Sequence, residues 1–163
     1  MLRVGHYGVA MLAYAPVVFV LLESGHPGFA GLGLPLLFVM SRLPDVDRRL
    51  PFVRHRGPTH TVWFATLTGA PVAFASVTKS GHLILDVPNA FGIGIPVLGV
   101  LSHLIADSLT PAGIRPFWPF SSRLVSFHLV RAANSVANYG LFLLGVLGLC
   151  IACLAGVNYP GNP

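Results

Sequence analysis

Five apolar segments, separated by short polar connections, make up most of this sequence. They cover residues 4–22, 29–41, 58–77, 89–109 and 132–157. A helix that crosses a bilayer needs about 20 predominantly apolar residues, so the short second segment would have to be tilted or covered by its neighbours. Inside lipid, a segment of this kind can satisfy its backbone polar groups only as a helix. The sequence therefore predicts an all-α, multi-pass membrane bundle of about five transmembrane helices.

The composition supports the membrane assignment. Only 9% of the 163 residues are charged and 54% are hydrophobic, whereas a soluble domain carries about 25% charged residues. The length suits a single domain over residues 1–163. The formal charge of +5 does not indicate a nucleic-acid partner, because the cations lie in short connections between apolar segments, where they suit contact with lipid head groups.

The arginines predict the orientation of the bundle. With five spans, the N-terminus and the connections 42–57 and 110–131 lie on one side of the membrane, and that side holds all nine arginines. Lys79 is the only cation on the other side. Because cationic residues favour the cytoplasmic side, we expect the N-terminus to lie inside, in the cell's inner membrane.

Seven residues able to bind a metal ion lie on this cytoplasmic side. They are His6, Asp45, Asp47, His55, His60, His103 and Asp107. Ionisable residues at the edge of a membrane domain are costly and mark functional sites. The sequence therefore predicts a metal site at the cytoplasmic end of the bundle.

The spacing within the motifs suggests how these ligands are presented. His103 and Asp107, in SHLIAD, are four residues apart and share a helix face, so they could bind one ion or form a structural pair. In LPDVD we expect an extended segment that points Asp45 and Asp47 the same way. They would either share metal ions or form ion pairs with the nearby arginines. In HRGPTH, His60 falls in the first turn of the third helix, where a packing role is the alternative.

Together these motifs resemble the YdjM-type family of membrane proteins. LPDVD, HRGPTHT and LSHLIADSLTPAGIRPFWPF carry the resemblance, which runs from His6 to about Leu124. The family is described as LexA-regulated and of the inner membrane, with metal-dependent hydrolysis as its inferred activity. It is distantly similar to zinc-dependent phospholipases C and related single-strand nucleases, all-α enzymes with clustered His and Asp ligands. The resemblance implies phosphoester hydrolysis and supports His6 as a ligand, while Thr61 stands where the family usually has serine.

The expected chemistry is hydrolysis by a metal-activated water. Mixed imidazole and carboxylate ligands suit about one to three zinc ions, or manganese where carboxylates dominate. We expect Asp47 to be a ligand or the general base, and His55 to be a ligand or a proton donor. Arg56 and Arg123 are candidates to clamp a phosphate, and Trp118 is an interfacial anchor or part of a lipid entrance.

The predicted substrate is a phosphorylated lipid or small molecule at the inner membrane surface. The alternative from another class is a non-enzymatic membrane metal-binding protein, either a carrier or a sensor. A carrier needs a polar path across the bilayer, and the outer halves of these helices offer little beyond scattered hydroxyls. The sequence contains no HExxH motif of the kind that metallopeptidases use.

Overall fold

The computed structural model describes the chain except for residues 50–51, 53–54, 76, 78–85 and 160–163. Arg54, Lys79 and His82 therefore lie outside the described residues. The elements, in order, are α1 (Arg3–Glu23), α2 (Pro27–Met40), η1 (Leu43–Arg49), η2 (Pro58–His60), α3 (Val62–Ala75), α4 (Val87–Ser108) and α5 (Ser135–Val157), where η1 and η2 are 3₁₀ helices. The predicted all-α, multi-pass class is confirmed.

Four stretches are long and apolar enough to cross a membrane. They are α1, the stretch Pro27–Arg49 that joins α2 to η1, α4 and α5. The third predicted span is represented by α3, which is apolar but has only 14 residues. It is therefore shorter than the roughly 20 residues that a straight span requires.

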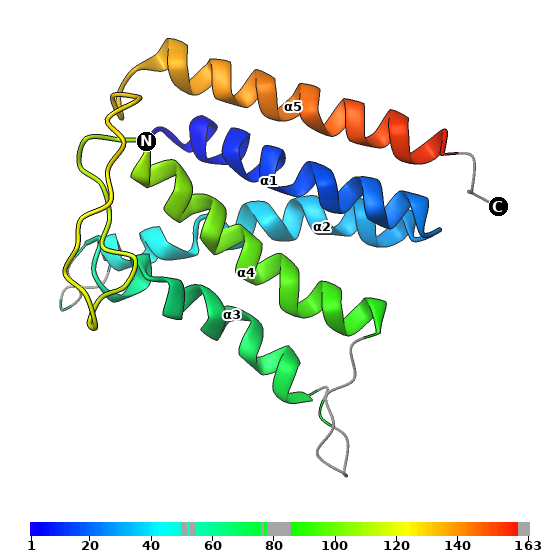
Figure 1. The fold of residues 1–163 in the computed structure, drawn as a ribbon, viewed down its shortest axis with the longest axis horizontal. Helices are drawn as coiled ribbons and strands as arrows, with labels where there is room; N and C mark the ends of the chain where they lie inside the picture. Colours follow the sequence, from blue (N-terminus) through cyan, green and yellow to red (C-terminus); the bar gives the residue numbers. More distant parts are fainter. Residues whose placement is uncertain (50–51, 53–54, 76, 78–85, 160–163) are drawn as a thin grey trace.

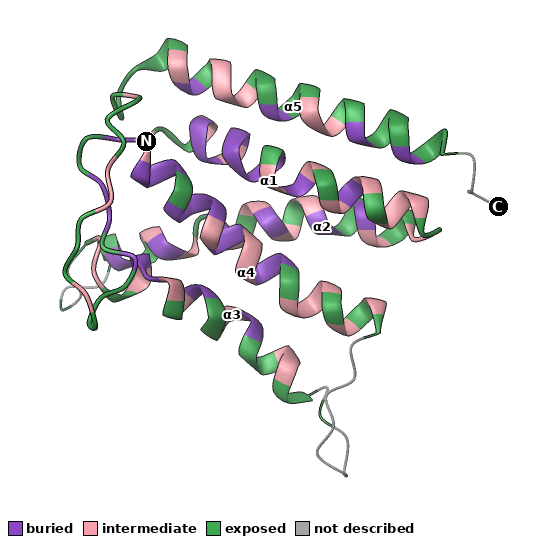
Figure 2. Ribbon diagram, in the orientation of Figure 1, coloured by how far each residue is buried: buried purple, intermediate pink, exposed green. Residues whose placement is uncertain are grey.

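The helices place the motifs LPDVD, HRGPTH and SHLIAD at one end of the bundle (Figure 1). Helices α1, α2 and α4 pack against one another, while α5 packs on α1 and α3 packs on α4 (Figure 1). The N-terminus, η1, η2, the end of α4 and the start of α5 lie at the same end (Figure 1). Buried residues of α1 and α4 concentrate toward this end, whereas much of α5 is exposed (Figure 2).

Glycines set the close approach of these helices. A Cβ on Gly145 of α5 would lie 2.5 Å from the carbonyl oxygen of Gly8 in α1, so the two backbones meet directly. A Cβ on Gly99 of α4 would lie 2.6 Å from the Cβ of Met40 at the end of α2. Small residues allow such contacts between membrane helices. The second contact brings the end of α2 against the turn of α4 that carries His103.

The third helix begins later than predicted. We expected residues 58–77, but Pro58 begins only the short η2, and Thr61 is extended at φ −122° and ψ 155°. The Thr61 hydroxyl accepts a hydrogen bond from the backbone N–H of Phe64 at 3.2 Å. This bond satisfies one of the free N–H groups that every helix start presents, and α3 therefore starts at Val62.

The expectation of an extended LPDVD segment is wrong. The segment lies in the 3₁₀ helix η1, in which Asp45 N donates to Arg42 O at 3.2 Å. Asp45 also pairs with Arg48, three residues later, at 3.2 Å, and a turn of three residues brings such pairs together. Because residues two apart diverge on this helix, Asp45 and Asp47 face different parts of the site.

Candidate metal centre

Three buried imidazoles from three elements meet at this end of the bundle. His6 comes from α1, His60 from η2 and His103 from α4, and their exposed fractions are 5%, 0% and 1%. The rings of His6 and His103 stack with their centroids 4.2 Å apart. The ring of His60 meets that of His103 edge-on at 5.2 Å.

Hydrogen bonds to the Nδ1 atoms fix the protonation of these rings. Nδ1 of His103 lies 2.7 Å from the carbonyl oxygen of Ser41, and Nδ1 of His6 lies 3.1 Å from that of Leu2. A carbonyl oxygen only accepts, so each Nδ1 donates a proton and each Nε2 of the neutral ring keeps a lone pair. Metal-binding histidines are oriented by second partners in this same way.

His60 follows the same pattern through the Thr59 hydroxyl, which lies 3.1 Å from Nδ1 of His60 and donates to Oδ2 of Asp47. Because that hydroxyl already donates to Asp47, it accepts from Nδ1 of His60, and Nε2 of this ring also keeps a lone pair. Burial, followed by the neighbouring His103, lowers the pKa of His60 to about 4. The ring is therefore neutral at physiological pH, as a metal ligand must be.

The three Nε2 atoms gather around Asp107. Nε2 of His60 and Nε2 of His103 each lie 3.6 Å from Oδ2 of Asp107, and they are 3.3 Å from each other. Nε2 of His6 lies 3.4 Å from Oδ1 of Asp107. Asp45 approaches from η1, with its Oδ1 3.9 Å from Nε2 of His103.

Two of these atoms have no partner of their own. Nε2 of His6 and Oδ2 of Asp107 are buried without a hydrogen-bond partner in the described part of the chain, whereas Oδ1 of Asp45 is held by its ion pair with Arg48. Leaving such atoms unsatisfied is costly. One divalent ion would satisfy lone pairs from imidazole and carboxylate together. The donor set therefore fits a metal, and these buried His and Asp residues could bind one.

Three overlapping groups of ligand atoms meet the distance requirement. Within each group the atoms lie within 4.8 Å of one another: His6 with His103 and Asp107; Asp45 with His60 and His103; Asp47 with His55 and His60. The structure thus brings all seven predicted ligands into one connected cluster.

Asp47, in η1, binds the loop 55–60, which carries two of the histidines. Its Oδ1 lies 2.9 Å from Nδ1 of His55. Its Oδ2 accepts hydrogen bonds from the backbone N–H of Arg56 and the hydroxyl of Thr59, both at 3.0 Å. Both oxygens of this 1% exposed side chain are therefore engaged in holding the loop 55–60.

Arg56 is tied to the cluster, and its contact with a substrate stays a prediction. Its Nη2 lies 3.2 Å from Oδ1 of Asp107, and its Nη1 donates to the carbonyl oxygen of Gly113 at 3.0 Å. Its backbone has φ 61°, so the left-handed residue of this turn is Arg56 and not Gly57, whose φ is −94°. Such a conformation is uncommon for a residue with a side chain, and here the contacts with Asp47 and Asp107 hold it.

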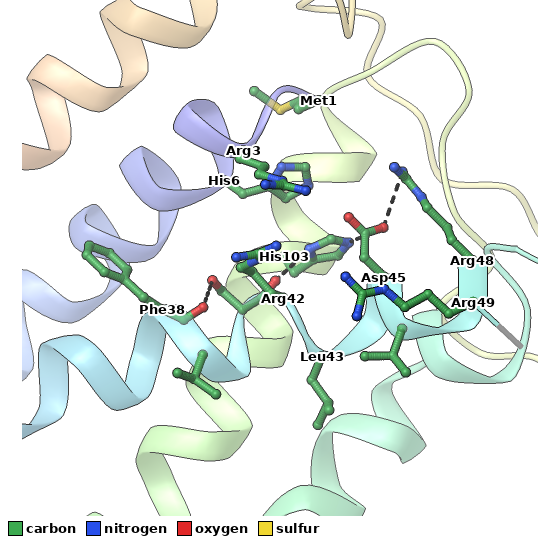
Figure 3. Close-up of a pocket in the computed structure, with 13 residues that line it drawn as sticks. Met1, Arg3, His6, Phe38, Arg42, Leu43, Asp45, Arg48, Arg49 and His103 are labelled. Atoms are coloured by element: carbon green, nitrogen blue, oxygen red, sulfur yellow. Dashed lines mark hydrogen bonds and ion pairs between the residues drawn. The ribbon is translucent and has the colours of Figure 1, made fainter.

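A cavity of about 450 Å³ lies beside the cluster (Figure 3). Figure 3 shows His103 with His6 and Arg3 on one side and Asp45 on the other. Four arginines line the cavity: Arg3, Arg42, Arg48 and Arg49. Sequence reasoning assigned these arginines to membrane orientation and did not choose them for the site. The signal that could have found them is spacing, because Arg3 precedes His6 by three residues and Arg48 follows Asp45 by three.

Two predicted substrate contacts lie apart from this cavity. Trp118 is 45% exposed and Arg123 is exposed, both on the loop between α4 and α5. Neither is among the described residues that line the cavity. Their contact with a substrate stays a prediction.

Comparisons with known proteins identify the family. The family model described as YdjM inner membrane protein matches residues 1–160. Two curated relatives, each named Inner membrane protein YdjM, come from Escherichia coli (strain K12) and Shigella flexneri. Each is 30% identical over 101 residues, which cover 53% of this chain and 48% of the relative.

The chain thus spans about half the length of the curated relatives it matches. No solved structure matches it. The family match covers nearly all of the chain, and the helices it covers include the four candidate spans. This chain belongs to the YdjM family of inner membrane proteins.

Proposed function

We propose that this protein is a membrane-bound, metal-dependent hydrolase that cleaves a phosphoester at the cytoplasmic end of the bundle. The observation that carries the proposal is the convergence of three Nε2 atoms on the Asp107 carboxylate: those of His60 and His103 lie at its unpartnered Oδ2, and that of His6 lies at its Oδ1. His6, His60, His103 and Asp107 would hold the ion, with Asp45 beside them. Zinc suits this donor set best, and manganese is the second choice.

A bound divalent ion would lower the pKa of a coordinated water and polarise the phosphoester under attack. The surrounding residues position the ligands for this chemistry. Arg56 holds Oδ1 of Asp107 and thereby turns Oδ2 toward the histidines. Asp47 accepts the hydrogen bond of the Thr59 hydroxyl, which in turn accepts from His60 Nδ1, and so keeps Nε2 of that ring available.

His55 is the best placed proton carrier of the cluster. Its side chain is 38% exposed, and its Nδ1 contacts the fully buried Asp47. A histidine that is oriented by a carboxylate and open to solvent can pass a proton to or from a reacting group. Because both oxygens of Asp47 are engaged, we assign the positioning role to Asp47 and the transfer of a proton to the leaving group to His55.

The arginine-lined cavity supports a phosphate as the group that is recognised. Guanidinium groups offer paired donors to phosphate oxygens, and this cavity lies directly against His103 and Asp45. The substrate is a phosphorylated lipid or a small phosphorylated molecule that reaches the inner membrane surface.

The first test is metal content and metal-dependent turnover of the purified chain in detergent. We expect about one to three zinc-type ions per chain by elemental analysis, and release of phosphate or of a phosphorylated head group that stops with a chelator and returns with zinc. His103→Ala and Asp107→Ala should abolish both metal retention and turnover. His128→Ala is the matched control, because His128 is exposed on the loop between α4 and α5.

Full turnover in the His103 or Asp107 variant would show that the chemistry lies elsewhere. Metal transport into proteoliposomes without any hydrolysis would instead favour the carrier. In that case His103→Ala should stop transport, while the chain hydrolyses no phosphoester at any metal concentration.

A further inference from the structure

The cavity beside the cluster gathers more positive charge than the chain itself neutralises. Asp45 is the only acidic residue among those that line it, against four arginines. Arg48 pairs with Asp45 at 3.2 Å. Within the described part of the chain, the guanidinium groups of Arg3, Arg42 and Arg49 make no hydrogen bond or ion pair. Like charges gathered in this way repel one another unless an anion lies between them.

The four arginines come from separate elements that fold onto one opening. Arg3 begins α1, Arg42 follows α2, and Arg48 and Arg49 end η1. Arginines that served only to orient the chain could lie anywhere on the cytoplasmic side. Arg115, Arg123 and Arg131 do lie elsewhere, outside this cavity. This cluster of four arginines therefore suits a ligand with several negative charges.

One wall of the same cavity is apolar. Phe38 and Val39 lie in the last turn of α2, and Leu43 and Val46 in η1. Val39 and Val46 are 62% and 43% exposed, and all four belong to the candidate span Pro27–Arg49. In Figure 3, Phe38 lies at the side of the cavity away from Arg48 and Arg49. The cavity thus joins a cationic region to the exposed apolar surface of a candidate membrane span.

We propose that this cavity binds a lipid whose head group ends in a phosphate of two or more negative charges, a phosphomonoester or a diphosphate. The head group lies among Arg3, Arg42 and Arg49, and the acyl chains leave past Phe38 and Val39. A phosphomonoester carries about −1.5 to −2 charges at pH 7, whereas a phosphodiester carries only about one. The assignment as a substrate rests on the proposed hydrolase, but the binding itself does not require turnover.

Binding to the delipidated protein in detergent tests this proposal. The probes are dioleoyl phosphatidic acid, dioleoyl phosphatidylglycerol with the same acyl chains, and inorganic phosphate, each titrated and followed by native mass spectrometry. We expect phosphatidic acid to bind at least about tenfold more tightly than phosphatidylglycerol, because one further charge meets an unpaired guanidinium. Inorganic phosphate should bind more weakly than either lipid, since it lacks the apolar contacts.

Paired arginine variants locate the site. Arg42→Gln with Arg49→Gln should weaken phosphatidic acid binding by at least about tenfold and remove its preference over phosphatidylglycerol. Arg115→Gln with Arg131→Gln removes the same charge from the same side of the membrane, outside the cavity, and should leave the affinity unchanged. Equal thermal midpoints of the two double variants in the absence of lipid confirm that both are folded.

Three results would overturn the proposal. They are equal affinity for the two lipids, an equal loss in both double variants, and inorganic phosphate that binds as tightly as phosphatidic acid. His60→Ala separates this proposal from the hydrolase, because His60 is a proposed metal ligand that does not line the cavity. This variant should abolish turnover and retain lipid binding. Arginine-dependent binding of phosphatidic acid without any turnover in the wild type would support the lipid site and contradict the hydrolase.

Discussion

The most informative single perturbation is Asp47→Asn, because it separates a residue that orients a ligand from a residue that binds the metal. Asn keeps the size of Asp47 but offers one acceptor oxygen where the structure uses two. At least one of the hydrogen bonds with His55, Arg56 N or Thr59 must be lost or reversed, and the bond with Thr59 is the one that leads to His60. Loss of an orienting partner reduces metal affinity by about 10- to 100-fold, which corresponds to about 1.4 to 2.7 kcal/mol.

The assay is a competition titration of zinc against a chelator, with the purified chain in detergent. Asp107→Asn should reduce the affinity far more than Asp47→Asn, because Oδ2 of Asp107 lies 3.6 Å from two Nε2 atoms and has no other partner. Asp86→Asn is the matched control. Asp86 caps the other end of α4 through Asn89 N at 3.0 Å, and Asn caps a helix equally well.

Two results would refute this division of roles. If Asp47→Asn abolishes zinc binding as completely as Asp107→Asn, then Asp47 is itself a ligand, as the sequence alone allowed. If zinc affinity does not change at all, then the contact between Asp47 and His60 does not orient that ring.

Two further predictions concern the bundle and its pH dependence. Gly145→Leu should lower the thermal midpoint, at a cost of about 1 to 3 kcal/mol or more, because its side chain would meet the Gly8 backbone, whereas Gly140→Leu, with nothing within 4 Å, should be tolerated. Equal midpoints would mean that α1 and α5 do not meet there. In chelator-treated protein, the free energy of unfolding should be at its full value above pH 6.5 and should fall as the pH drops toward 4. In this range the histidine at position 60 binds a proton in the unfolded chain but not in the folded protein, where its pKa is lowered to about 4. His60 should contribute about 3 kcal/mol to this loss, so the loss should be smaller by about that amount in His60→Gln, as judged by thermal unfolding at each pH.

The apolar segments predicted the helices because membrane spans need only length and low charge. The first predicted segment, 4–22, became Arg3–Glu23, and the last, 132–157, became Ser135–Val157. The late start of α5 follows from Asn134, whose side chain accepts a hydrogen bond from Ala137 N at 3.1 Å. Local polar caps therefore set the ends that hydropathy leaves open.

The convergence of the ligands was partly accessible from sequence. The pairing of His103 with Asp107 follows from helical spacing alone, and their separation of 3.6 Å agrees with it. The place of His6 could not be worked out in this way, because its contact with Asp107 depends on how α1 packs against α4. From the sequence, His6 was a candidate only by its place on the cytoplasmic side, and the family resemblance strengthened it.

The 3₁₀ helix at LPDVD was not accessible from local pattern, since proline at the second position fits both an extended and a helical start. This 3₁₀ helix determines which partners the carboxylates of Asp45 and Asp47 contact. Asp45 faces the cavity and Arg48, whereas Asp47 turns inward to the loop 55–60. Partners distant in sequence, His55 and His60, make that second direction favourable.

Arg56 explains how the buried carboxylate of Asp107 is tolerated in the metal-free protein. An isolated buried carboxylate is strongly destabilising, and breaking a buried ion pair costs about 3 to 5 kcal/mol. Arg56 neutralises Oδ1 of Asp107 from one side and leaves Oδ2 for the ion. The same guanidinium also donates to Gly113 in the loop between α4 and α5. One residue thus couples the folding of two connections to the geometry of the ligand that the metal needs, which is why its left-handed backbone conformation is retained.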